Sequence, residues 1–191
     1  MMWRNTEREA ERWCKIFHRQ PHLSHLIRRV RLEDFYPPFL IRFLKLLKMA
    51  TDMNLWFHVT SGYRSFDEQN EIFEQGRSLP GQIVTQAQGG QSLHNFGLAI
   101  DVVRNQLVQS PLVKPVWEKT AYEDLNKLSQ EVDLEWGGNW NNFKGDVYHL
   151  QYPLEGIPIA KLKRIYESTY RTGSEKKALK EVWKYLEIEQ E

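Results

Sequence analysis

Apolar residues in the first fifty positions recur at helical spacing. One face carries Ala10, Trp13, Cys14 and Phe17. Pro21 is predicted to end this helix, a short second helix is expected over residues 24–30, and Pro37-Pro38 opens a third that runs past Ala50. The N-terminal part of the chain is therefore predicted to be helical scaffold.

Beyond Leu55 the apolar spacing changes from helical to alternating. Alternation over residues 55–60 and 98–103 predicts two strands, and shorter strands are expected at 134–136 and 147–152. Ser65 and Glu68 are placed to cap a helix that stops at Gly76, and residues 122–132 form another helical stretch. Residues 77–93 are a polar, glycine-containing loop, and two helical segments follow Pro158. Helices first, then strands with an inserted helix, predict an α+β fold with a small antiparallel sheet.

Composition narrows the classes of function. The net charge of +1 gives no electrostatic argument for nucleic acid or an anionic membrane as a partner. Arg42, Lys45 and Lys48 interrupt the longest apolar stretch, residues 39–50, so membrane insertion is not expected. Charged residues between Arg4 and Glu11 stand where a signal peptide needs an apolar core, so we expect synthesis in the cytoplasm without such a signal. No pattern indicates an oligomeric state.

Two segments carry the candidate chemistry. His94 and Asp101 lie in the first, residues 92–101, and His149 lies in the second, residues 146–149. Two imidazoles and one carboxylate are a typical catalytic zinc ligand set, which leaves a fourth position for water. Asp101 falls on the polar face of a predicted strand. His94 precedes that strand, so both can meet one ion only if the chain reverses at Asn95-Phe96-Gly97, where Gly97 supplies the freedom.

Two further residues complete a hydrolytic site. Asp146 precedes His149 by three positions and is predicted to be the general base that activates water and passes the proton to the leaving amine. Arg64 follows a Ser-Gly-Tyr turn at a strand end, where its guanidinium can hold a carbonyl oxygen or a carboxylate. The Gly-Gly-Asn-Trp turn before Asp146 is expected to wall a substrate cleft through Trp140 and Phe143.

Other interpretations use the same residue types. A non-haem Fe(II) oxygenase also binds iron through two histidines and a carboxylate, but its first two ligands commonly lie one residue apart on a strand, whereas His94 and Asp101 are seven apart. His18, His22 and His25 could form a second metal site; with Pro21 between them and no matching carboxylate, surface histidines are the preferred interpretation.

The segments resemble the LAS-type, VanY-like zinc peptidases of peptidoglycan. This family comprises D-alanyl-D-alanine carboxypeptidases, vancomycin-resistance D,D-peptidases, and L-alanyl-D-glutamate endopeptidases of phage lysins and sporulating bacteria. Its pattern Ser-x-His-x-x-Gly-x-Ala-x-Asp is matched by residues 92–101, its acid three residues before a histidine by Asp146 and His149, and its Ser-Gly-Tyr-Arg-Ser turn by residues 61–65. Runs at 68–90 and 136–140 resemble the endopeptidase branch most, although Asn139 stands where many relatives carry Asp.

The resemblance implies a Hedgehog/D-Ala-D-Ala peptidase-like α+β fold, with a zinc site on its small antiparallel sheet and extra helices at both termini. It implies one Zn²⁺ ion on His94, Asp101 and His149, Asp146 as base, Arg64 as clamp, and substrate contacts by Gln69 and Ser92. The expected organisation is a helical extension over residues 1–35, a zinc peptidase domain over 36–156, and a C-terminal helical hairpin over 157–191 that either packs on the domain or binds a partner or the wall.

The implied activity is hydrolysis of an amide in the peptidoglycan stem peptide, most of all between L-Ala and D-Glu. A D-alanyl-D-alanine carboxypeptidase is the alternative within the family. A peptidoglycan-binding protein with a purely structural zinc ion is the alternative outside enzymes, although such an ion has no use for Asp146 or Arg64. An enzyme of this kind is expected to act on the cell wall after release, as a phage endolysin or a bacterial remodelling hydrolase.

Overall fold

The predicted α+β class is confirmed. The computed structural model describes residues 2–141 and 145–189, which form a four-stranded antiparallel sheet and seven α-helices. The chain divides into two units: unit 1 is Met1–Gly62 with Ala99–Pro153, and unit 2 is Tyr63–Leu98 with Leu154–Glu191. Among the described residues, no helix combines the length and the apolar character that crossing a membrane requires.

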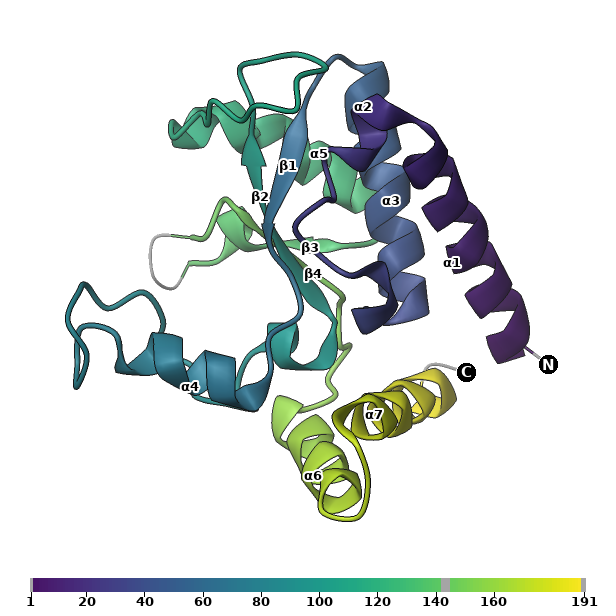
Figure 1. Ribbon diagram of the computed structural model, residues 1–191, viewed down its shortest axis with the longest axis vertical. Helices are drawn as coiled ribbons and strands as arrows, with labels where there is room; N and C mark the ends of the chain where they lie inside the picture. The colour runs from purple at the N-terminus through teal and green to yellow at the C-terminus, as the bar shows by residue number, and fades with distance from the viewer. Residues whose placement is uncertain (1, 142–144, 190–191) are drawn as a thin grey trace. The chain divides into compact units, whose positions relative to one another are not determined.

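Unit 1 contains the sheet (Figure 1). Its strands are β1 (Phe57–Ser61), β2 (Ala99–Arg104), β3 (Glu135–Trp136) and β4 (His149–Gln151). Its helices are α1 (Met2–Arg19), α2 (Pro21–Ser24), α3 (Pro37–Asp52) and α5 (Glu123–Glu131), with 3-10 turns η1 (Leu32–Asp34), η3 (Lys119–Tyr122) and η4 (Gly137–Asn139). The strand order is β1-β2-β4-β3, so the two middle strands come from sequence segments fifty residues apart.

The core of unit 1 lies along α3. This helix has apolar residues on most of its surface, and Phe39, Phe43, Leu44 and Leu47 are fully buried. Helix α1 packs beside α3 (Figure 1), where Lys45 also pairs with Glu9 at 3.1 Å. Burial of large apolar side chains at about 25 cal/mol per Å² makes such a core the main stabilising term for the sheet-bearing unit.

Unit 2 contains α4 (Phe66–Glu74), the 3-10 helix η2 (Leu93–Phe96), α6 (Ile159–Tyr170) and α7 (Glu175–Glu189). The predicted capping box is present: Ser65 Oγ accepts from the Glu68 amide, and the Glu68 carboxylate accepts from the Ser65 amide. Phe66 stacks on Tyr166 with ring centroids 4.3 Å apart, and Phe96 packs edge-on against both rings. Helices α6 and α7 pack against each other as the expected hairpin.

One local expectation was wrong. The first helix ends at Arg19, just before Pro21 as predicted, but Pro21 also starts the next helix, so the helix expected over residues 24–30 is instead the single turn α2. Residues 25–31 then run as turns. The predicted domain boundaries stay a prediction; in the structure the N-terminal helices belong to the same unit as the sheet, and the C-terminal hairpin belongs to the same unit as residues 63–98.

Candidate metal centre

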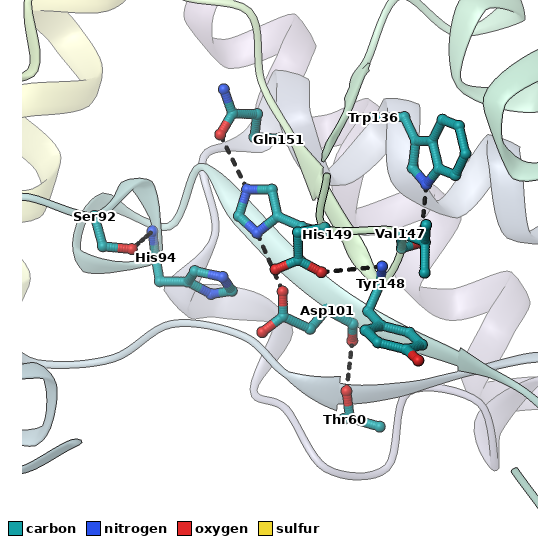
Figure 2. Close-up of polar contacts among 10 residues, drawn as sticks. Thr60, Ser92, His94, Asp101, Trp136, Val147, Tyr148, His149 and Gln151 are labelled. Carbon is teal, nitrogen blue, oxygen red and sulfur yellow. Dashed lines mark hydrogen bonds and ion pairs between the residues drawn. The ribbon is translucent and has the colours of Figure 1, made fainter. Parts of the chain in front are cut away.

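Asp101 and His149 are direct partners on the two middle strands. The antiparallel register places Asp101 of β2 opposite His149 of β4. Their side chains therefore project from the same face of the sheet, and His149 Nδ1 lies 3.1 Å from Asp101 Oδ1 (Figure 2). His149 is buried and Asp101 is largely buried. Two of the three predicted ligands are thus held together by backbone pairing alone.

The second ring nitrogen of His149, Nε2, faces away from Asp101, and its hydrogen-bond partner shows that Nε2 is protonated. Gln151 Nε2 donates to Glu135 Oε2 at 2.8 Å, and because a carboxylate only accepts, the Gln151 amide orientation is fixed. Its carbonyl Oε1 lies 3.0 Å from His149 Nε2, so that nitrogen carries the proton. Glu135 Oε1 in turn accepts from Trp140 Nε1 at 2.6 Å. In its neutral form His149 therefore presents its Nδ1 lone pair to Asp101, and in its protonated form it donates a hydrogen bond from Nδ1 to Asp101.

A lone pair and a carboxylate oxygen 3.1 Å apart repel each other unless a cation lies with them. Burial by itself lowers the pKa of His149, but the hydrogen bond and charge of Asp101, with Gln151 and the charge of Asp146, raise that pKa above its ordinary value overall. The pair therefore attracts a proton or a metal ion. Adjacent ligands of a tetrahedral zinc ion at about 2.0–2.1 Å lie about 3.3 Å apart, close to the distance between these two atoms.

His94 belongs to η2, and its backbone is fixed at both ends of this turn. Ser92 Oγ accepts from the His94 amide at 3.4 Å (Figure 2), and the His94 carbonyl accepts from the Arg64 amide at 3.2 Å. Gly97 follows with φ +67°, the left-handed conformation that other residues adopt at a cost. The predicted reversal between His94 and Asp101 is therefore present and occurs at the predicted glycine.

Asn95 holds η2 to two other segments of unit 2. This side chain is fully buried. Its Oδ1 accepts from the amides of Gly90 and Ser92 at 2.9 and 3.3 Å, and its Nδ2 donates to the carbonyls of Arg64 and Ser65 at 3.0 and 3.3 Å. One amide side chain thus links the end of the long loop, the turn of His94 and the turn of Arg64.

One potential ligand atom from each of His94, Asp101 and His149 lies within 4.8 Å of the other two. Two nitrogens and one carboxylate oxygen at this separation suit a divalent zinc ion, and the Nδ1 lone pair of His149 is available for it. A hydrogen-bond partner on the far nitrogen of a ligating histidine is the usual second support of such sites, and Gln151 is that partner here.

Asp146 lies on the exposed turn that leads into β4. Its Oδ1 accepts from the Tyr148 amide at 3.1 Å, and its carbonyl accepts from the His149 amide at 3.2 Å. The carboxylate is solvent-exposed, and its charge contributes to the raised pKa of His149. The turn therefore keeps Asp146 beside a proposed ligand while leaving it open to water.

The remaining predicted site residues differ in what surrounds them. The ring of Trp140 lies 5.0 Å from that of His149, centroid to centroid. Gln69 is fully buried, and its Nε2 donates to the Ala87 carbonyl, which ties α4 to the loop. Ser92 caps η2. Substrate contacts by these three residues stay predictions, and Phe143 lies outside the described residues.

Sequence reasoning missed the residues that hold the ligands. Gln151 lies two positions after His149, and strand alternation alone places it on the ligand face. Asn95 and Glu135 gave no comparable signal, because their partners are distant in sequence.

Cys14 has its pKa raised to about 11 by burial, which leaves its thiol protonated and inert at neutral pH.

A family model described as VanY: D-alanyl-D-alanine carboxypeptidase matches residues 37–153, more than half of the chain. The chain belongs to this family. The peptidoglycan L-alanyl-D-glutamate endopeptidase CwlK of Bacillus subtilis (strain 168) is 38% identical over 102 residues, which cover 49% of this chain and 58% of CwlK. The chain thus spans less than two thirds of that relative.

Solved structures of peptidoglycan peptidases also resemble the chain. The L-Ala D-Glu endopeptidase ChiX of Serratia marcescens is 24% identical with a TM-score of 0.47, covering 63% of this chain and 82% of ChiX. A mutant of the D,D-pentapeptidase VanY from a VanB-type vancomycin-resistance cassette, in complex with Zn(II), is 17% identical with a TM-score of 0.45, covering 66% of this chain and 76% of that protein.

Proposed function

We propose that this protein is a zinc-dependent peptidase that hydrolyses the L-alanyl-D-glutamate bond of the peptidoglycan stem peptide. The observation that carries the proposal is the cluster of His94, Asp101 and His149, in which one potential ligand atom from each residue lies within 4.8 Å of the other two and the His149–Asp101 pair attracts a proton or a metal ion. Family membership supports a peptidase of peptidoglycan, and the similarity to CwlK supports the endopeptidase bond.

His94, Asp101 and His149 would hold the ion. A bound zinc ion would polarise the scissile carbonyl and lower the pKa of a water molecule to about 7. The chain's own contribution at this point is orientation: the strand register fixes Asp101 and His149, and Gln151 holds the His149 ring with its Nδ1 toward the site.

Asp146 would act as general base and then as general acid. Its carboxylate would take a proton from the attacking water and give it to the nitrogen of the leaving amine, so the carboxylate base would be regenerated within one turnover. The exposure of this carboxylate and its backbone support by the Tyr148 amide favour the role, because the group stays accessible and oriented.

Arg64 would bind the negative charge of the substrate. Its guanidinium can hold a carboxylate of the stem peptide or the carbonyl oxygen on which charge develops. The backbone of Arg64 bonds to the carbonyl of His94 and to the side chain of Asn95. A displacement of the Arg64 turn would therefore also displace the turn of His94, and the reverse.

The description of the matching family favours a second candidate, a D-alanyl-D-alanine carboxypeptidase. Both candidates use the same ligands and base, and they differ in which amide reaches the site. Mass spectrometry of the digested muropeptides separates them. Cleavage at L-Ala releases a peptide that begins with D-Glu, whereas the carboxypeptidase removes only the terminal D-Ala.

The test is digestion of purified sacculi by the full chain, with and without a chelator and with zinc restored. We expect release of D-Glu-terminated peptides that stops with the chelator and resumes with zinc. Asp146→Asn should keep folding and zinc content while lowering the rate by about 10²–10⁴-fold. Asp52→Asn, an exposed aspartate on α3, is the matched control and should keep full activity. Absence of any product from the zinc-loaded protein would refute the proposal.

A further inference from the structure

The C-terminal hairpin lies outside the family match, which ends at residue 153, yet α6 and α7 share a unit with residues 63–98. That segment carries both His94 and Arg64. The hairpin therefore belongs to the surroundings of two proposed site residues, and its contacts there can be followed one by one.

The first contact supports the turn of His94. Trp183 of α7 is nearly fully buried, and its indole Nε1 donates to the carbonyl of Phe96 at 2.7 Å. Phe96 is the last residue of η2 and is itself fully buried. A buried carbonyl at a helix end needs a hydrogen-bond partner, because leaving it without one is costly. Trp183 supplies that partner two residues beyond His94.

The second contact supports the turn of Arg64. Tyr63, the residue before Arg64, donates its hydroxyl to Glu175 Oε1 at 2.5 Å, at the first residue of α7. Burial and this hydrogen bond raise the pKa of Tyr63 above its ordinary value, so the hydroxyl stays protonated and keeps donating. Glu175 also lies 3.4 Å from the hydroxyl of Tyr166 on α6.

The third contact lies at the end of the long loop. Lys163 of α6 donates to the carbonyl of Gly89 at 3.2 Å, and a Cβ on Gly90 would lie 2.8 Å from the Lys163 side chain. The amide of Gly90 is one of the donors to Asn95. All three contacts thus act on backbone that Asn95 joins together.

We propose that the α6–α7 hairpin is a positioning element of the metal centre, with Trp183 as its principal residue. Trp183 holds the end of η2 and thereby the orientation of His94, while the Tyr63–Glu175 bond holds the turn of Arg64. The metal-related part of this inference rests on the proposed function. Under this proposal the hairpin supports the site from within unit 2 and does not serve as a module that binds the wall or a partner.

The test compares Trp183→Phe with Leu186→Ala in the 191-residue chain. Leu186 is a fully buried residue of the same helix whose side chain has no polar atom, so its truncation weakens the packing of α7 and leaves the indole bond in place. Urea unfolding measures the stability of both variants. Cobalt(II) and zinc titrations measure metal affinity, and the cobalt absorption spectrum reports ligand geometry.

We expect Trp183→Phe to weaken metal binding by about tenfold or more and to change the cobalt spectrum, as loss of a support behind a ligand typically does. Leu186→Ala should stay within about twofold of the unaltered protein in metal affinity. Equal losses in both variants, or none in Trp183→Phe, would overturn the assignment of Trp183.

Amide hydrogen exchange gives a readout that needs no metal. Exchange over residues 93–98 should be faster in Trp183→Phe than in Leu186→Ala under conditions that give the two variants equal stability. Failure of the unaltered protein to bind metal would refute the proposed function, whereas the exchange comparison still decides whether Trp183 positions η2. Unchanged exchange over 93–98 in Trp183→Phe would overturn the positioning role.

Discussion

The protein holds its proposed ligands in two different ways. Asp101 and His149 lie on paired strands, where the backbone ladder sets their separation and Gln151 bonds to the far nitrogen of His149. His94 stands on a four-residue turn that has no ladder. Its place depends on Ser92, Asn95, Gly97 and the backbone of Arg64.

The difference shows what each kind of support requires. Strand pairing brings two side chains together as a consequence of register, because slippage of one strand by one residue would turn its side chain to the other face and separate the pair. A turn has few internal hydrogen bonds, so its position comes from buried polar contacts with distant segments. The turn-borne ligand should therefore be the more sensitive to changes in residues that never touch the ion.

The largest expected effect comes from removing a ligand of the strand pair. His149→Ala takes away a ligand but leaves the backbone pairing of β2 and β4, so zinc uptake should be lost without unfolding. Loss of the metal contribution of several kcal/mol corresponds to a fall in kcat/KM of about 10³-fold or more. Zinc content and sacculus digestion measure this, and His149→Ala retaining one tightly bound zinc ion would contradict the ligand assignment.

The second-largest effect is expected from removing the hydrogen bonds of Asn95, which support the turn of His94. Asn95→Leu removes four hydrogen bonds and leaves buried amides and carbonyls without partners, so the free energy of unfolding should fall by about 3 kcal/mol. Urea denaturation measures the change. Asn139→Ala is the control, because its amide is exposed and bonds to the exposed side chain of Asn126, and it should change stability by less than about 0.5 kcal/mol. Similar losses of unfolding free energy in both variants would contradict the role of Asn95 in joining the three segments.

A change in pH tests the sheet-bearing unit separately. Burial, followed by the charge of Arg28, lowers the pKa of His58 on β1 to about 4 from 6.5; the charges of His25 and Arg29 act in the same direction, and a hydrogen bond to the His25 backbone opposes them. Between these values the unfolded chain binds the extra proton and the folded chain does not, so stability is lost as pH falls through this window. From pH 7 to pH 5 the contribution of His58 should be a loss of about 2 kcal/mol, whereas the raised pKa of His149 acts in the opposite direction.

The measurement is urea unfolding at pH 7 and pH 5 for the unaltered protein and His58→Asn. The variant should lose most of this pH dependence. His22→Asn, an exposed histidine of the same unit, should keep it. An unchanged slope in His58→Asn would place the acid sensitivity elsewhere.

The smallest effect is expected at Gln151, which supports the strand-borne ligand His149. Gln151→Leu removes the acceptor behind His149 Nε2, so the ring loses its fixed tautomer while the register stays. Zinc affinity should fall about tenfold, equivalent to about 1.4 kcal/mol. Zinc titration against a competing chelator measures it, with the exposed Gln130→Leu as control. If Gln151→Leu lost more zinc affinity than Asn95→Leu titrated in the same way, the contrast between strand and turn would be reversed.

The sequence predicted the fold class and the local backbone geometry around the candidate site because both depend on short-range patterns. Alternation located β1 and β2, and Ser65 with Glu68 located the start of α4. Gly97 was predicted to reverse the chain, and it does so with a positive φ. These features depend on spacing or on the conformational range of a single residue, which the sequence displays directly.

The supports of the site could not be predicted in the same way. Asn95 bonds to Arg64 thirty-one positions earlier, and Trp183 bonds to Phe96 eighty-seven positions earlier. Helical periodicity shows that Trp183 faces a core but not which carbonyl it meets. Pro21 is compatible with either end of a helix from its local sequence, and only the structure shows that it begins one.

The reversal at Gly97 has a practical consequence for engineering. Only six residues connect His94 to Asp101, and their path includes a 3-10 turn, one left-handed glycine and the first strand residues, so no slack remains for an added amino acid. Affinity tags or fused binding modules should instead be inserted at residues 77–84, an exposed stretch of the long loop outside any helix or named strand. An insertion should therefore be tolerated at residues 77–84 and should disturb the site between His94 and Asp101.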